Sequence, residues 1–71
     1  MRFVKFRIKS PTIALFPVDG RYAARTVPEG SIVTINDTLL KENKLVEVTL
    51  QGTPVRMFAQ DIRARGEEVA D

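Results

Sequence analysis

The sequence contains no histidine, no cysteine and no tryptophan. Without cysteine the chain forms neither a disulfide framework nor a thiolate zinc site, and it has no thiol nucleophile. Without histidine it lacks the commonest general base, the commonest metal ligand and the side chain that titrates near neutral pH. These absences exclude most of the ways in which a small domain performs chemistry.

No stretch of the sequence approaches the roughly 20 consecutive apolar residues that cross a membrane. A secretory signal needs an uninterrupted apolar stretch after a basic start, and the N-terminal segment has none. Four basic residues interrupt it: Arg2, Lys5, Arg7 and Lys9. We therefore expect no signal peptide and no membrane association, and we interpret the chain as a complete small cytoplasmic protein.

The 71 residues suffice for one domain with a thin hydrophobic core. Hydrophobic residues make up 44% of the chain and charged residues 28%, which is typical of a globular domain rather than a disordered one. We predict a single domain over residues 1–71.

The net charge of +2 hides an uneven distribution along the chain. Residues 1–25 carry six basic and one acidic side chain, a balance of +5, whereas residues 26–71 carry five basic and eight acidic ones, a balance of −3. Such a division is found in proteins that contact nucleic acid or an anionic surface. It is also found where charges only solvate two faces of a small sheet.

Apolar residues recur with a period of two, which is typical of half-buried strands. The clearest case is segment 3–9, where the even positions are apolar and the odd positions are mostly basic. In the segment up to residue 44, turn-forming residues predict turns and β-branched residues predict strands. These are turns at 17–20 and 28–30, strands at 21–27 and 32–35, and a polar loop at 36–44.

Residues 45–58 predict a β-hairpin whose turn is Gln51-Gly52. A two-residue turn fixes the register, because Leu50 and Thr53 then close it. Apolar residues face each other on one side of this hairpin and opposite charges on the other. The predicted pairs are Val48 with Val55, Val46 with Met57, and Glu47 with Arg56.

Pro54 is compatible with this hairpin and constrains what lies beyond it. The pair of Thr49 and Pro54 is of the non-hydrogen-bonded kind, so the missing N–H removes no bond from this ladder. On the side of residue 54 that faces away from Thr49, proline has no N–H to donate to a further strand. We therefore expect a sheet edge or a bend there.

Residues 59–65 break the alternation and predict one or two helical turns, with acidic Asp61 early and Arg63 and Arg65 late. Gly66 follows as a left-handed residue that ends the helix. Segment 67–71 is either a short last strand or a tail. The pattern as a whole predicts an all-β fold, a small barrel of about five short antiparallel strands with one helical or 3₁₀ turn near residues 59–65.

Residues 27–70 resemble the small SH3-like β-barrels of bacteria. The likeness rests on VPEGSIVTI at 27–35, LVEV at 45–48, Gly52, and VRMFAQDI at 55–62. In such barrels a Pro-x-Gly turn precedes a strand, a hairpin follows, and a short 3₁₀ turn precedes the last strand. The resemblance implies an SH3-like barrel but no single function, since these domains are functionally mixed. The segments that bind proline-rich peptides in eukaryotic SH3 domains have no match here.

The residues present do not indicate a catalytic site. Ser10 and Ser31 have no histidine to activate them, and neighbouring residues such as Lys9 and Ser10 point to opposite faces of a strand. Asp37 and Glu42 share a loop that lacks the further oxygen ligands of a calcium site. The four glycines form no phosphate-cradling fingerprint. We predict no enzyme activity, no catalytic residue, no metal or cofactor site and no small-molecule substrate.

The first strand carries the one group of residues that suggests a binding surface. Phe3, Lys5, Arg7 and Lys9 line a single face with about 6.7 Å between successive side chains. This spacing is near that of phosphates in an extended single strand, and an aromatic ring beside basic residues stacks a base. The alternative is a solvated strand face, with Phe3 covered by a loop or by a second subunit.

These observations favour a non-catalytic binding or structural module that mediates protein–protein contact or self-association. A protein partner or a homo-oligomer is expected, because Phe3 on a charged face and a sheet edge near Pro54 suit a contact surface. The alternative is a small barrel that binds nucleic acid through the basic first strand.

Overall fold

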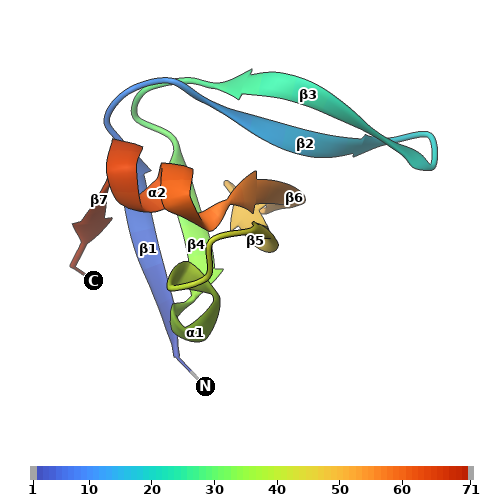
Figure 1. The fold of residues 1–71 in the computed structure, drawn as a ribbon. Helices are drawn as coiled ribbons and strands as arrows, with labels where there is room; N and C mark the ends of the chain where they lie inside the picture. The colour runs from blue at the N-terminus through green and yellow to red at the C-terminus, as the bar shows by residue number, and fades with distance from the viewer. Residues whose placement is uncertain (1, 71) are drawn as a thin grey trace.

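The computed structural model describes residues 2–70, which form a seven-stranded antiparallel sheet and two short helices (Figure 1). Met1 and Asp71, the ends of the predicted domain, lie outside the described residues. The strands are β1 (Phe3–Ile8), β2 (Thr12–Val18), β3 (Arg21–Val27), β4 (Ile32–Asn36), β5 (Leu45–Leu50), β6 (Thr53–Phe58) and β7 (Gly66–Val69). The helices are α1 (Asp37–Leu40) and α2 (Ala59–Arg65). The strand order is β3-β2-β6-β5-β4-β1-β7, so β3 and β7 form the two edges of the sheet.

The all-β prediction is confirmed, but the sheet has seven strands where the sequence predicts about five. Two segments account for the difference. Residues 12–18 form an additional strand that pairs with the predicted strand at 21–27, because Asp19 and Gly20 both adopt the positive φ that a tight turn needs (49° and 77°). Residues 66–69 form a strand rather than a tail, because they pair with β1.

The predicted register of the β5–β6 hairpin is confirmed. Glu47 faces Arg56, Val48 faces Val55, and Leu50 and Thr53 close the turn. Gln51 and Gly52 have φ of 47° and 88°, as a turn with two left-handed residues requires.

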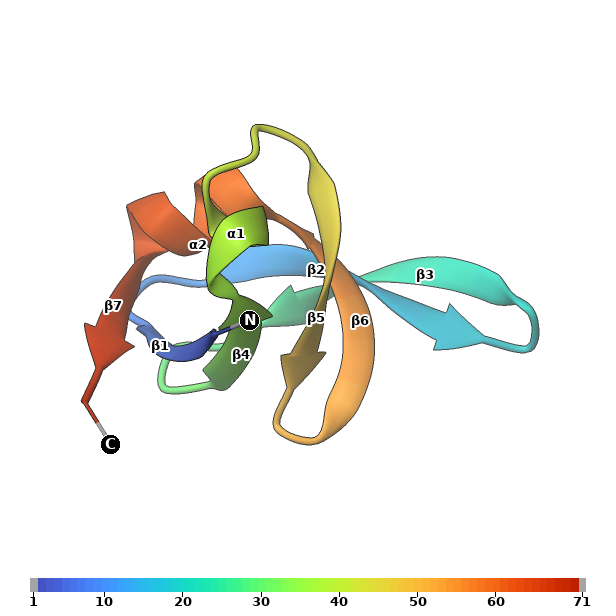
Figure 2. The same cartoon turned by 90° about the horizontal axis from the view of Figure 1, so that it is seen from below.

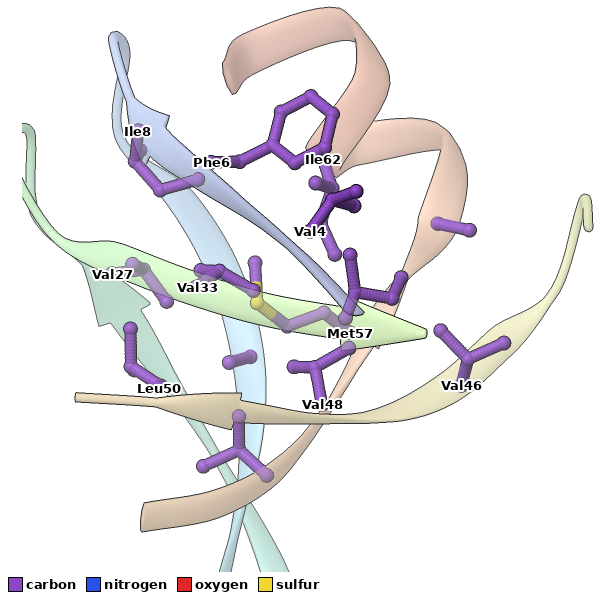
Figure 3. Packing of buried hydrophobic residues seen from close by; sticks show 14 residues of the cluster. Val4, Phe6, Ile8, Val27, Val33, Val46, Val48, Leu50, Met57 and Ile62 are labelled. Atoms are coloured by element: carbon purple, nitrogen blue, oxygen red, sulfur yellow. The ribbon is translucent and has the colours of Figure 1, made fainter. Parts of the chain in front are cut away.

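The core lies on the concave face of the curved sheet, where alternate side chains of the strands meet (Figure 3). β1 shows the pattern most simply, since its buried and exposed residues alternate along the whole strand. α2 closes the core with Ala59 and Ile62, both fully buried. The largest fully buried side chains are Ile8, Ile35, Met57, Ile62, Val27, Val33 and Val55.

Helix α2 occupies the predicted residues 59–65 and is held against the segment after α1. The Arg63 guanidinium donates hydrogen bonds to the carbonyls of Leu40 and Glu42 and to Oδ1 of Asn43. α1 itself forms where a loop was predicted, because Oδ1 of Asn36 accepts the Thr38 N–H at 2.9 Å and caps the turn.

The prediction that Gly66 is left-handed is wrong, since its φ of −120° and ψ of 162° are extended. Glycine is needed there for space. A Cβ at this position would lie 2.7 Å from the Ile62 carbonyl oxygen and 3.3 Å from Cδ2 of Phe6. The backbone therefore passes from α2 into β7 at a distance that only glycine allows.

We predict that Gly66→Ala destabilises the protein by about 1–3 kcal/mol, because the added methyl group must displace a backbone carbonyl in a packed region. The free energy of unfolding from urea titration measures this. Ala64→Ser, at an exposed position of α2, is the control and should change stability by less than about 0.5 kcal/mol. Equal stability of Gly66→Ala and the unmodified chain would contradict the steric explanation.

Candidate functional site

The residues singled out on the first strand lie where the sequence places them. Phe3, Lys5 and Arg7 project from the exposed face of β1, and Phe3 is 61% exposed. Lys9 follows the end of the strand, and its backbone N–H donates to the Arg65 carbonyl at 2.7 Å. The row of three side chains on one face, with Lys9 at its end, is therefore present.

Acidic residues of β7 lie beside this row. Glu67 is directly opposite Arg7, and its Oε2 is 3.6 Å from Nζ of Lys9. On the same edge, Oε2 of Glu68 is 3.9 Å from a guanidinium nitrogen of Arg2. The basic surface of β1 is thus partly neutralised by the C-terminal strand. The sequence pattern does not reveal this pairing, because it joins the two ends of the chain.

A hollow of about 240 Å³ adjoins Phe3 on the outer face of the sheet, between β1 and β6. Its walls combine an aromatic ring and an aliphatic side chain with hydroxyl, amide and carboxylate groups. Residues lining it include Phe3, Thr34, Asn36, Leu39, Glu47 and Thr49. One of its polar groups is already used within the chain, since Oδ1 of Asn36 accepts the Thr38 N–H.

The second exposed feature is the β2–β3 hairpin, which we call the arm. Its strands pair along all seven residues, from Thr12 opposite Val27 to Val18 opposite Arg21. The arm joins the rest of the sheet through one ladder pair, Leu15 with Arg56 of β6. The tip of the arm projects beyond the other strands (Figures 1 and 2).

Two prolines explain why the arm leaves the sheet. Continuing the register of Leu15 and Arg56 by two residues brings Pro17 opposite Pro54. This would be the next hydrogen-bonded pair between β2 and β6, and neither residue has an N–H to donate. The pairing therefore ends there, as the edge or bend predicted beside Pro54 requires.

Arginine side chains stack on both aromatic rings of the arm. The Arg56 guanidinium carbon lies 4.5 Å from the centre of the Tyr22 ring, and that of Arg25 lies 5.7 Å from the centre of Phe16. Both distances are within the range of cation–π attraction. They give the arm a cationic and aromatic surface, and Arg25 and Tyr22 lie on β3, far along the sheet from the basic residues of β1. The sequence feature that accompanies this surface is Pro17, two residues before the Asp19-Gly20 turn. The effect of Pro17 on the sheet becomes visible only in the register between β2 and β6.

The structure describes Ser31 and the acidic residues of positions 2–70, which the sequence analysis considers for catalysis and metal binding. The Ser31 hydroxyl donates to the Pro28 carbonyl at 2.7 Å, so it serves the turn. Within this range no three Asp or Glu side chains gather as metal ligands, and neither helix is long and apolar enough to cross a membrane. No family model matches the chain, and comparisons with curated proteins and with solved structures find no match.

We predict that replacing Pro17 and Pro54 together by valine extends the β2–β6 ladder, because both strands regain a donor. Nuclear Overhauser contacts between the Cα protons of residues 16 and 55, a close non-hydrogen-bonded pair in this register, should intensify. The free energy of unfolding should rise by about 1 kcal/mol.

Pro11→Val, outside the strands, is the control and should produce no such contacts. A double variant with an unchanged arm would show that something other than the missing donors separates β2 from β6.

Proposed function

We propose that this protein is a non-catalytic binding module that acts through protein–protein contact, self-association included. The observation that carries the proposal is the edge strand β3, seven residues long and set on an arm that one ladder pair connects to β6. A long edge with unpaired backbone groups is a template for another strand. An isolated two-stranded ribbon is only marginally stable in water, which also favours a covered state.

Exposed apolar side chains support the same proposal. Among residues 2–70, four large ones face solvent: Phe3 at 61%, Phe58 at 52%, Ile13 at 50% and Tyr22 at 46%. Aromatic residues and arginine are enriched at protein interfaces, and Tyr22 and Arg56 form such a pair. The proposed function requires no catalytic or metal-binding residue.

The likeness of residues 27–70 to bacterial SH3-like barrels, and a location in the cytoplasm, form part of this proposal. The turn at 28–30, the β5–β6 hairpin and the helix that precedes β7 support the likeness. The lack of cysteine supports the location.

We predict that a photo-reactive residue placed at Phe3 or at Ala24, in the full chain inside cells that express it, yields cross-linked products of higher mass. Protease should destroy these products and nuclease should leave them intact, because the partner is protein. A product of twice the chain mass indicates self-association.

Lys41, exposed after α1, is the control position and should yield little product. The proposal fails if neither test position gives a product, or if nuclease removes all of them.

Nucleic acid remains the second candidate, because Lys5 and Arg7 are exposed on one face of β1 beside Phe3. The carboxylate of Glu67 opposite Arg7 weighs against it. We expect binding to a single-stranded oligonucleotide no tighter than about 10⁻⁴ M, the weak end of non-specific affinity. Fluorescence anisotropy in low and high salt measures this.

Micromolar binding would favour the nucleic-acid candidate if it weakens steeply with salt and is abolished by the double substitution Lys5→Glu and Arg7→Glu.

A further inference from the structure

The outer edge of β3 presents backbone groups in the arrangement that an added strand uses. In a hairpin with a two-residue turn, the residues flanking the turn exchange hydrogen bonds, here Val18 and Arg21. Bonding positions then alternate along β3. Tyr22, Ala24 and Thr26 therefore direct their N–H and C=O groups away from β2, toward open space beyond the sheet edge.

The two faces of β3 differ in charge, and this difference defines the chemistry of a matching strand. Arg21 and Arg25 lie four residues apart on one face, and β3 contains no acidic residue. Tyr22 and Ala24 lie on the other face, where Tyr22 stacks against Arg56. A strand added here would place carboxylates opposite the arginines and apolar side chains opposite Tyr22 and Ala24.

A second copy of the chain fits this edge poorly. Pairing β3 with its own copy would gather four arginines along one seam, and β3 itself has no carboxylate to face them, an arrangement that like charges disfavour. The acidic edge strand β7 is no better, since Glu67 is already beside Lys9 and Glu68 beside Arg2. Nucleic acid needs more phosphate contacts than two arginines flanked by Asp19 supply.

We infer that the outer edge of β3 binds an extended acidic segment of another protein as an additional antiparallel strand. This inference rests on the proposed function and names its surface and partner. The segment has two acidic residues four positions apart, which face Arg21 and Arg25. Two apolar residues between them lie on the face of Tyr22. Backbone hydrogen bonds supply affinity in this mode of recognition, and the alternate side chains supply specificity.

A titration of the ¹⁵N-labelled full chain with a synthetic heptapeptide tests the inference. The probe carries glutamate at positions 2 and 6, valine at positions 3 and 5, and serine or threonine elsewhere. Amide resonances of Tyr22, Ala24 and Thr26 should shift most, because their N–H groups gain acceptors from the peptide.

Matched peptides separate backbone pairing from simple charge attraction. N-methylation of both valines should abolish binding, since their N–H groups face β3, whereas methylation at position 4 should leave it intact. Equal binding of the two methylated peptides would overturn the inference.

Variants of the protein test the charge match. Arg21→Glu with Arg25→Glu should weaken binding about tenfold and allow a peptide with lysine in place of glutamate to bind. Lys41→Glu with Lys44→Glu changes the net charge equally and should have no effect. Circular dichroism checks that both double variants remain folded. If reversal at 41 and 44 weakens binding as much, the inference is overturned.

Other outcomes overturn the inference in different ways. Shifts in β3 that grow with protein concentration alone would assign the edge to a second copy. Tighter binding of an oligothymidylate to the same amides would assign it to nucleic acid. An acidic peptide that causes no shift, in a chain that still cross-links to protein through Phe3, overturns the inference while the proposed function stands.

Discussion

Proline has no backbone N–H, and two prolines would face each other where β2 and β6 would otherwise continue to pair. Much of the shape of this protein depends on that missing pair of donors. Strand β6 keeps its complete ladder with β5 and contributes Val55 and Met57 to the core. Beyond Leu15, strand β2 no longer pairs with β6 and continues with β3 as the arm. The same two residues therefore leave the core intact and end the pairing of β2 with β6. The outer edge of β3 is open for a different reason, because β3 is the last strand of the sheet.

The second organising contact joins the ends of the chain. β1 lies between β4 and β7, so an N-terminal strand rich in basic residues lies beside a C-terminal strand that carries Glu67 and Glu68. The charge division along the sequence is thereby reduced in the folded protein. Uncompensated arginines instead lie on β3, at the opposite edge of the sheet. This redistribution is the reason why we propose a contact surface on the arm rather than on β1, where the composition suggested it.

Local patterns predicted local structure well. The β5–β6 register follows from a two-residue turn and complementary side chains, and the alternation of β1 follows from a period of two. Helix α2 follows from the loss of that period. The sequence did not predict contacts between distant segments: Leu15 opposite Arg56, Arg7 opposite Glu67, and the close approach of Ile62 to Gly66. Gly66 shows the reason, because a glycine that ends a helix looks the same in sequence whether it serves conformation or space.

The central claim is that the outer edge of β3 is open, and amide hydrogen exchange along β3 tests it most directly. If the outer edge is free, Ala23 and Arg25 exchange slowly because their N–H groups bond to β2, whereas Tyr22, Ala24 and Thr26 exchange rapidly. The account predicts this alternation of slow and fast amides in the isolated protein. Uniform protection of all five amides would show that the edge is already covered and would contradict the account.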